Sequence, residues 1–261
     1  VSFKCGTKVN VVPAAAEALF EGLDGDETEA LAKSMEEELG ITFTVSSEDG
    51  CLKIAASGEN GHASTPWKGK NALTGLLALI ERLPLAECGQ LKAVRALNHL
   101  MPHGDWFGAG LGIQISDEES GELTLAFSML DISEKSLEGE FDSRCPICAT
   151  KENTIDVIRK NMEAEGISFN TEELEPPHHV PADSDFVKTL LSAYESYSGR
   201  KGECIAIGGG TYVHHLKNGV AFGACLPETE NHMHGPDEFA VVDELLMSAK
   251  IFAQVIVDLC S

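Results

Sequence analysis

The chain has 261 residues, which is enough for one large domain or two small ones with a real hydrophobic core. Its 19 Lys and Arg against 42 Asp and Glu give a formal net charge of −23, which argues against nucleic acid or an anionic membrane surface as a partner. The sequence has no long apolar run that predicts a membrane span, and its eight scattered cysteines fit a reducing compartment, so we expect a cytoplasmic protein.

The first 60 residues combine strands with one helix. Leu31, Met35 and Leu39 recur every four residues, and the glycine that follows is well placed to end a helix. Residues 41–46 alternate with period two and are rich in β-branched side chains. The predicted elements are strands at 2–12 and 14–20, a helix over 26–39, and a hairpin of strands 41–46 and 51–57.

Glycines and prolines predict a loop over residues 58–70, after which Asn71 can cap a helix that Pro84 stops. The remaining elements of the first part are helices over 71–83, 91–100 and 154–165, and strands near 111–116, 122–132, 136–145 and 167–171.

The acidic segment 172–177 ends in Pro-Pro and is the best candidate for a domain boundary. Beyond it, Ser184 can cap a helix, and an amphipathic helix covers 242–260. Short apolar strands are predicted at 204–207 and 220–223. The sequence thus predicts an α+β part followed by an α/β segment.

Two glycine-punctuated segments could carry chemistry. His62 lies in Gly61–Pro66, a loop that can hold a side chain toward a partner, although an ordinary loop histidine is the alternative. Gly208, Gly209, Gly210 and Thr211 follow a predicted strand, where backbone N–H groups could approach an anion. A plain tight turn explains the three glycines equally well.

Three further features concern charge and metal binding. Segment 231–238 holds two histidines and two carboxylates, ligand types suited to Zn²⁺ or Mn²⁺, or else forms a surface turn. Arg144, at a predicted strand end, could clamp a carboxylate or form a structural salt bridge. Cys145 and Cys148 supply half a zinc site at most; a redox pair or two plain thiols are the alternatives.

Six motifs in order resemble one family, the M20 metallopeptidases, and within it the PepV-type (Sapep-like) dipeptidases. They are Asn10–Pro13, Gly61–Pro66 with Gly69–Ala72, Arg144–Pro146, Gly208–Tyr212, Asn218–Gly223 and His234–Phe239. The resemblance covers nearly the whole chain. One departure is Val213-His214, where the family usually has Ala-Arg.

The resemblance implies a zinc-peptidase-like α/β catalytic domain that binds two divalent ions, Zn²⁺ or Mn²⁺, with a substrate-capping lid domain inserted in it. Residues 1–177 would be the lid, and 178–261 the returning C-terminal part of the catalytic domain. The first catalytic half, with most metal ligands, would be missing. The implied reaction is hydrolysis of the peptide bond of dipeptides, and the chain alone would be inactive.

The resemblance also implies a role for individual residues. His234 would be a metal ligand, and His62 would stabilise the oxyanion formed at the scissile carbonyl. Asn10 and Arg144 would hold the C-terminal carboxylate of the dipeptide. Backbone amides of Gly208, Gly209, Gly210 and Thr211 would line the same pocket.

Two other functions stay open at this level. An M20 aminoacylase, carboxypeptidase or desuccinylase would share the metal site and differ in the lid. A non-catalytic binding or oligomerisation module is the third interpretation, since a lid of strands and helices can pair edge to edge with another copy as a homo-oligomer.

Overall fold

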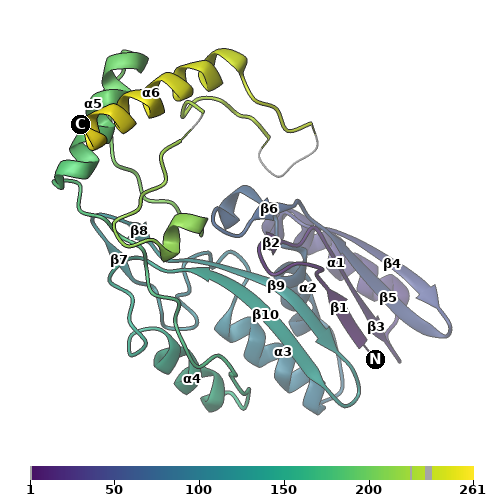
Figure 1. The fold of residues 1–261 in the computed structure, drawn as a ribbon. Helices are drawn as coiled ribbons and strands as arrows, with labels where there is room; N and C mark the ends of the chain where they lie inside the picture. The colour runs from purple at the N-terminus through teal and green to yellow at the C-terminus, as the bar shows by residue number, and fades with distance from the viewer. Residues whose placement is uncertain (1, 224, 233–236) are drawn as a thin grey trace. The chain divides into compact units, whose positions relative to one another are not determined.

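The structure is a computed structural model that describes residues 2–223, 225–232 and 237–261. It contains a six-stranded sheet and six α-helices, divided between two compact units, Val1–Pro176 and Pro177–Ser261 (Figure 1). Within the described ranges, no helix combines the length and apolar character needed to cross a membrane. The assignment of the two parts as lid and returning catalytic segment stays a prediction.

The first unit is built on an antiparallel sheet with strand order β10-β9-β1-β3-β5-β4. The predicted hairpin is confirmed. Its two strands are β4 (Thr42–Glu48) and β5 (Cys51–Ser57). The other strands of the sheet are β1 (Ser2–Cys5), β3 (Ala15–Phe20), β9 (Thr124–Ile132) and β10 (Leu137–Arg144). Alternate residues of β3 and β5 are buried, as expected for strands with one covered face.

Helices cover one face of this sheet (Figure 1). They are α1 (Gly25–Leu39), α2 (Ala72–Arg82) and α3 (Gly89–Leu100), and α4 (Ile155–Ala164) adds Ile158 and Met162 to the same core. Helix α2 is the central one and buries eight of its residues. Its Gly75 is needed for close packing, because a Cβ there would lie 2.7 Å from Cγ1 of Ile41.

The predicted helix ends are confirmed by their caps. Gly40 ends α1 with a positive φ of 64°, and its N–H donates to the carbonyl of Glu36. Asn71 Oδ1 accepts hydrogen bonds from the backbone N–H groups of Leu73 and Thr74. The amide of Asn71 also donates to the Phe127 carbonyl at 2.8 Å, so this cap joins α2 to β9.

Two short strands lie on the opposite face of β9. Strand β2 (Val11–Val12) pairs with β6 (Gly61–His62), and Val12 and Ala63 form a separate apolar cluster with Ala126. Neighbouring strand residues point to opposite faces, and Leu125 and Phe127 belong to the main core, so Ala126 faces away from the helices. The pair β7 (Ser116–Asp117) and β8 (Gly121–Glu122) completes the strands of this unit.

The second unit consists of α5 (Asp185–Ser198), the 3₁₀ helix η2 (Tyr212–His215) and α6 (Val242–Cys260), joined by irregular segments. The expected cap of α5 is confirmed, since Ser184 Oγ accepts from the N–H of Val187 at 3.3 Å. The two long helices pack through a small apolar cluster of Leu190, Ala193, Ile251 and Val255. The chain thus mixes sheet and helix, but the described part of this unit contains no strand.

The two strands predicted in this unit are therefore wrong. Ile205 and Ile207 are 80% and 61% exposed, and no described strand lies beside 204–207 to accept its backbone hydrogen bonds. Segment 220–223 is also irregular, but Val220 and Phe222 pack against the α5–α6 cluster. An apolar run needs a neighbouring strand as well as burial before it becomes a strand.

Three strand predictions in the first unit are wrong in whole or in part. The strand expected over 2–12 breaks at Gly6, whose φ is +85°. In segment 111–116, a turn at 111–112 is followed by irregular chain, the Ile113 N–H donates to the Gly108 carbonyl, and only Ser116 belongs to a strand, β7. In segment 167–171, Phe169 stacks on Phe141, and no strand pairs with it. In the last two segments, alternate side chains are shielded from solvent although most of the backbone belongs to no strand.

His103 connects three parts of the first unit. Its Nε2 donates to the Leu39 carbonyl at the end of α1 at 2.9 Å, and its Nδ1 lies 2.8 Å from the Thr74 hydroxyl on α2. Burial lowers the pKa of His103 below its usual value, and the hydrogen bond to Leu39 opposes this only in part. The folded protein therefore favours the neutral imidazole.

This preference predicts an acid-dependent loss of stability. Because the pKa of His103 is lower in the folded than in the unfolded chain, its contribution is complete above the unfolded pKa of about 6.5 and is lost as the pH falls below it. We expect His103→Leu to cost about 1 kcal/mol at pH 7.5, since it removes the hydrogen bond to the partly buried Leu39 carbonyl, and to flatten the stability decline toward pH 5. Urea unfolding across this range measures both effects.

The control is Gln114→Leu, because Gln114 is an exposed residue of the same unit with an uncharged side chain. We expect this variant to keep the wild-type slope of stability against pH below 6.5. A His103→Leu variant that keeps that slope would contradict the prediction.

Candidate functional site

Asn10 and His62 are neighbours because β2 pairs with β6. Val11 is opposite His62 in the register, and the N–H of Ala63 donates to the Asn10 carbonyl at 3.1 Å. The side chains of Asn10 and His62 are both exposed. Two predicted substrate-contacting residues that are 52 positions apart in sequence therefore lie together in the first unit.

Small residues allow this pair of strands to be held tightly. A Cβ at Gly61 would lie 3.0 Å from the backbone of Gly69, and one at Gly69 would lie 2.9 Å from the Glu59 carbonyl. Gly69 ends the 3₁₀ helix η1 (Pro66–Lys68) that follows the His62 loop. The segment predicted as a loop thus folds back on itself, and its glycines serve close backbone contact.

Arg144 belongs to the same face of the sheet. It is opposite Thr124 in the β9–β10 register, and Asp142 is opposite Ala126. Paired residues of antiparallel strands point to the same side, and Thr124 and Ala126 both contact Ala63, the residue after His62. The structure thus brings Asn10, His62 and Arg144 to one face of the first unit.

Arg144 makes an ion pair with Asp142, two residues before it on β10. Its Nε donates to Oδ1 at 2.6 Å and its Nη2 donates to Oδ2 at 2.7 Å. The two side chains are only 26% and 11% exposed. A salt bridge was one of the two interpretations of Arg144, and this partner could have been found in sequence, because positions i and i+2 of a predicted strand share a face.

Ser64 fixes the orientation of the His62 ring. The backbone N–H of Ser64 donates to His62 Nδ1 at 3.2 Å, and the Ser64 hydroxyl lies 2.7 Å from the same nitrogen. A nitrogen that accepts an N–H bond carries no proton, so the proton of the neutral ring is on Nε2. That N–H is the group that His62 can donate to a ligand.

The chain beyond Arg144 is held by Asp117. This carboxylate accepts hydrogen bonds from the N–H groups of Ser120 and Cys148, and these lower its pKa to about 2. Burial raises the pKa of the Cys145 thiol, and desolvation together with Asp117 raises that of Cys148. Raised pKa values disfavour the thiolate that redox chemistry needs, so this segment acts as an anchored turn.

The glycine segment belongs to the second unit. Gly208, Gly209, Gly210 and Thr211 are exposed and directly precede η2. Gly209 and Gly210 have no positive φ, and a Cβ at either would meet no atom within 4 Å. Neither backbone strain nor packing within this unit requires glycine there. His234, the predicted metal ligand, lies outside the described residues.

The described residues do not form the predicted two-metal site. Within residues 2–223, 225–232 and 237–261, no group of three or more His, Cys, Asp or Glu is arranged to hold a metal ion. Near the glycine segment, the ring of His214 lies 5.6 Å from that of His178, whose Nε2 donates to the Gly219 carbonyl. Two histidines alone do not complete such a site.

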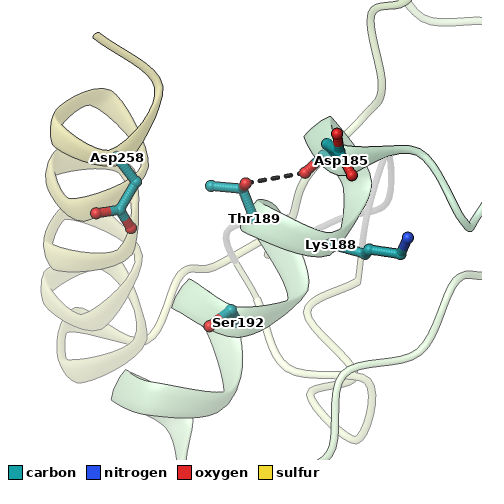
Figure 2. A pocket seen from close by; sticks show the side chains of 5 residues that line it. All are labelled: Asp185, Lys188, Thr189, Ser192 and Asp258. Atoms are coloured by element: carbon teal, nitrogen blue, oxygen red, sulfur yellow. Dashed lines mark hydrogen bonds between the residues drawn. The ribbon is translucent and has the colours of Figure 1, made fainter. Parts of the chain in front are cut away.

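A hollow of about 370 Å³ lies between α5 and α6. Figure 2 shows Thr189 and Asp258 on facing helices, and the Lys188 side chain is directed away from Asp258. The Oγ1 hydroxyl of Thr189 donates to the Asp185 carbonyl (Figure 2). The residues that line this hollow are Asp185, Lys188, Thr189, Ser192 and Asp258. None of them is buried, and the hollow contains no histidine or cysteine, so we do not regard it as a reaction site.

Comparison with known proteins identifies the family. Residues 16–258 match the family described as Peptidase family M20/M25/M40, so the chain belongs to this family of metal-dependent peptidases, and the resemblance seen in the motifs is confirmed. This assigns the chain to a class of hydrolases.

Several curated dipeptidases are similar over the whole chain. "Putative dipeptidase YtjP" of Bacillus subtilis is 36% identical over 99% of this chain and 55% of its own length. "Beta-Ala-Xaa dipeptidase" of Lactobacillus delbrueckii subsp. lactis is 31% identical over 98% of this chain and 54% of its own length. "Putative dipeptidase" of Staphylococcus epidermidis is 29% identical over 100% of this chain and 55% of its own length. The chain therefore spans about half the length of these relatives.

The His62 geometry predicts one tautomer in solution. With the neutral ring, we expect Nδ1 to be unprotonated and Nε2 protonated, because the Ser64 N–H occupies Nδ1. Selective ¹⁵N labelling of histidine and NMR of the neutral ring would report this directly. We expect Ser64→Ala to keep the tautomer, since the backbone donor remains. A proton found on Nδ1 would contradict the prediction.

Proposed function

We propose that this chain is part of a metal-dependent dipeptidase, with residues 1–177 as the substrate-capping lid and 178–261 as the C-terminal part of the catalytic domain. The observation that carries the proposal is the placement of Asn10, His62 and Arg144 on one face of the first unit. The dipeptidase names of the relatives support the same substrate class.

These three side chains divide the recognition of a dipeptide between them. His62 donates its Nε2–H to the oxygen of the scissile carbonyl, where negative charge develops as the bond is attacked. Arg144 and Asn10 bind the C-terminal carboxylate, for which a planar guanidinium is the best partner. A cation at a fixed distance from the reacting carbonyl selects short substrates, since a longer peptide places its carboxylate elsewhere.

The metal ligands are the remaining part of the proposal. We assign His234 as one ligand to a Zn²⁺ or Mn²⁺ pair and expect the others from a part of the protein outside this chain, because the described residues do not form such a site. On this basis the chain alone does not hydrolyse peptides. A cytoplasmic location and a homo-oligomer formed through the lid stay predictions.

The test uses the full-length protein that contains this chain, loaded with Zn²⁺ or Mn²⁺. We expect it to hydrolyse dipeptides faster than N-acyl amino acids, and His62→Ala to lower kcat by about 10²–10³, as loss of one oxyanion donor typically does. Steady-state kinetics on both substrate classes measure these effects.

His99→Ala removes an exposed histidine on α3 and serves as the control, with kcat expected to stay at the wild-type value. A preference for acyl amino acids would favour an aminoacylase-type amidohydrolase instead. Absence of hydrolysis on either class would favour a binding or oligomerisation module.

A further inference from the structure

The ion pair between Asp142 and Arg144 has a defined orientation. Asp142 binds the edge of the guanidinium formed by Nε and Nη2, with one carboxylate oxygen on each nitrogen, at 2.6 and 2.7 Å. Both side chains are largely shielded from solvent, Asp142 more than Arg144. Such a two-point contact fixes the plane of the guanidinium as well as its position.

This contact leaves the other edge of the guanidinium available. Arginine has five N–H donors, and the pair uses the one on Nε and one of the two on Nη2. The edge formed by Nη1 and the second N–H of Nη2 has the spacing that a second carboxylate accepts in a bidentate manner. Arg144 can therefore bind two carboxylates at once, on different edges.

We propose that Asp142 is a positioning residue for substrate binding: it holds Arg144 so that the free guanidinium edge receives the C-terminal carboxylate of the dipeptide. This inference rests on the function proposed above. Asp142 itself does not contact the substrate.

Two observations favour this role over a bond that serves stability alone. The register places the pair opposite Thr124 and Ala126, the two residues that contact the chain next to His62, so the pair lies on the face that carries the candidate site. The pair also holds a long, flexible side chain in one conformation before the ligand arrives, which removes part of the entropy that binding would otherwise lose.

The experiment compares Asp142→Asn with wild type in the full-length, metal-loaded protein on a dipeptide and on the same dipeptide with a C-terminal amide. Asparagine keeps the shape, but its NH₂ group cannot accept from Nη2, so the two-point contact is lost. We expect KM for the dipeptide to rise about tenfold, with kcat changed less. KM for the amide, or its inhibition constant if it is not cleaved, should not change.

Two further variants separate positioning from a general loss of structure. Arg144→Ala should raise KM for the dipeptide more than Asp142→Asn does, and the double variant should match Arg144→Ala, because Asp142 acts only through Arg144. Glu138→Gln, an exposed carboxylate-to-amide change on the same strand, should leave both substrates unaffected.

The outcomes are distinct. If Asp142→Asn leaves KM for the dipeptide unchanged or lowers it, Asp142 does not position Arg144 for substrate, and a lower KM would mean that it competes with the substrate. An equal loss on the amide would show a structural role only. If wild type does not cleave dipeptides, the proposed function fails and this inference fails with it. If Arg144→Ala affects dipeptide and amide alike, Arg144 does not bind the C-terminal carboxylate, and only the roles of Arg144 and Asp142 are overturned.

Discussion

Strand β9 is buried on both of its faces, and the arrangement of the candidate site depends on this constraint. Leu125 and Phe127 point into the helix-covered core, while Ala126 packs against Val12 and Ala63 on the other side. A strand with two covered faces cannot shift by one residue without exchanging its two sets of side chains. The register with β10, and with it the position of Arg144, is therefore strongly specified.

The His62 loop has little regular structure and is instead positioned by its contacts with β9. Ala63 and Ala126 bring the loop close to the strand because their side chains are small, and the Gly61–Gly69 contact lets the loop fold back at backbone distance. A larger residue at any of these positions would require the backbone to move. Rigid support from packed small residues allows a side chain to be exposed and yet oriented, as the Ser64–His62 hydrogen bonds show.

Local signals in the sequence predicted local structure well. The caps at Gly40, Asn71 and Ser184 are confirmed because a cap depends only on residues within one helical turn. Segments 111–116 and 204–207 were wrongly predicted as strands, because pairing depends on partners that periodicity does not reveal. Apolar alternation indicates which side chains are buried, and Ile113 is buried although it lies in an irregular segment outside any strand.

The same distinction applies to the candidate site. Motifs located His62 and Arg144 along the chain, but their placement on one face follows from pairings between segments far apart in sequence, β2 with β6 and β9 with β10. Asp142 was not singled out, since one carboxylate among 42 acidic residues carries no signal until the strand and its facing are known. Once a strand is predicted over 136–145, the i, i+2 spacing to Arg144 distinguishes Asp142 from its acidic neighbours on β10.

The strongly acidic composition also bears on the recognition of a dipeptide that we propose for this chain. A net charge of −23 repels a carboxylate and attracts an ammonium group, and a dipeptide carries one of each, so the long-range field gives little net attraction. Screening at physiological salt reduces that field further beyond about 8 Å. Recognition of the C-terminal carboxylate therefore has to come from short, oriented hydrogen bonds. A half-buried guanidinium already fixed by Asp142 can supply such bonds where a freely moving surface cation cannot.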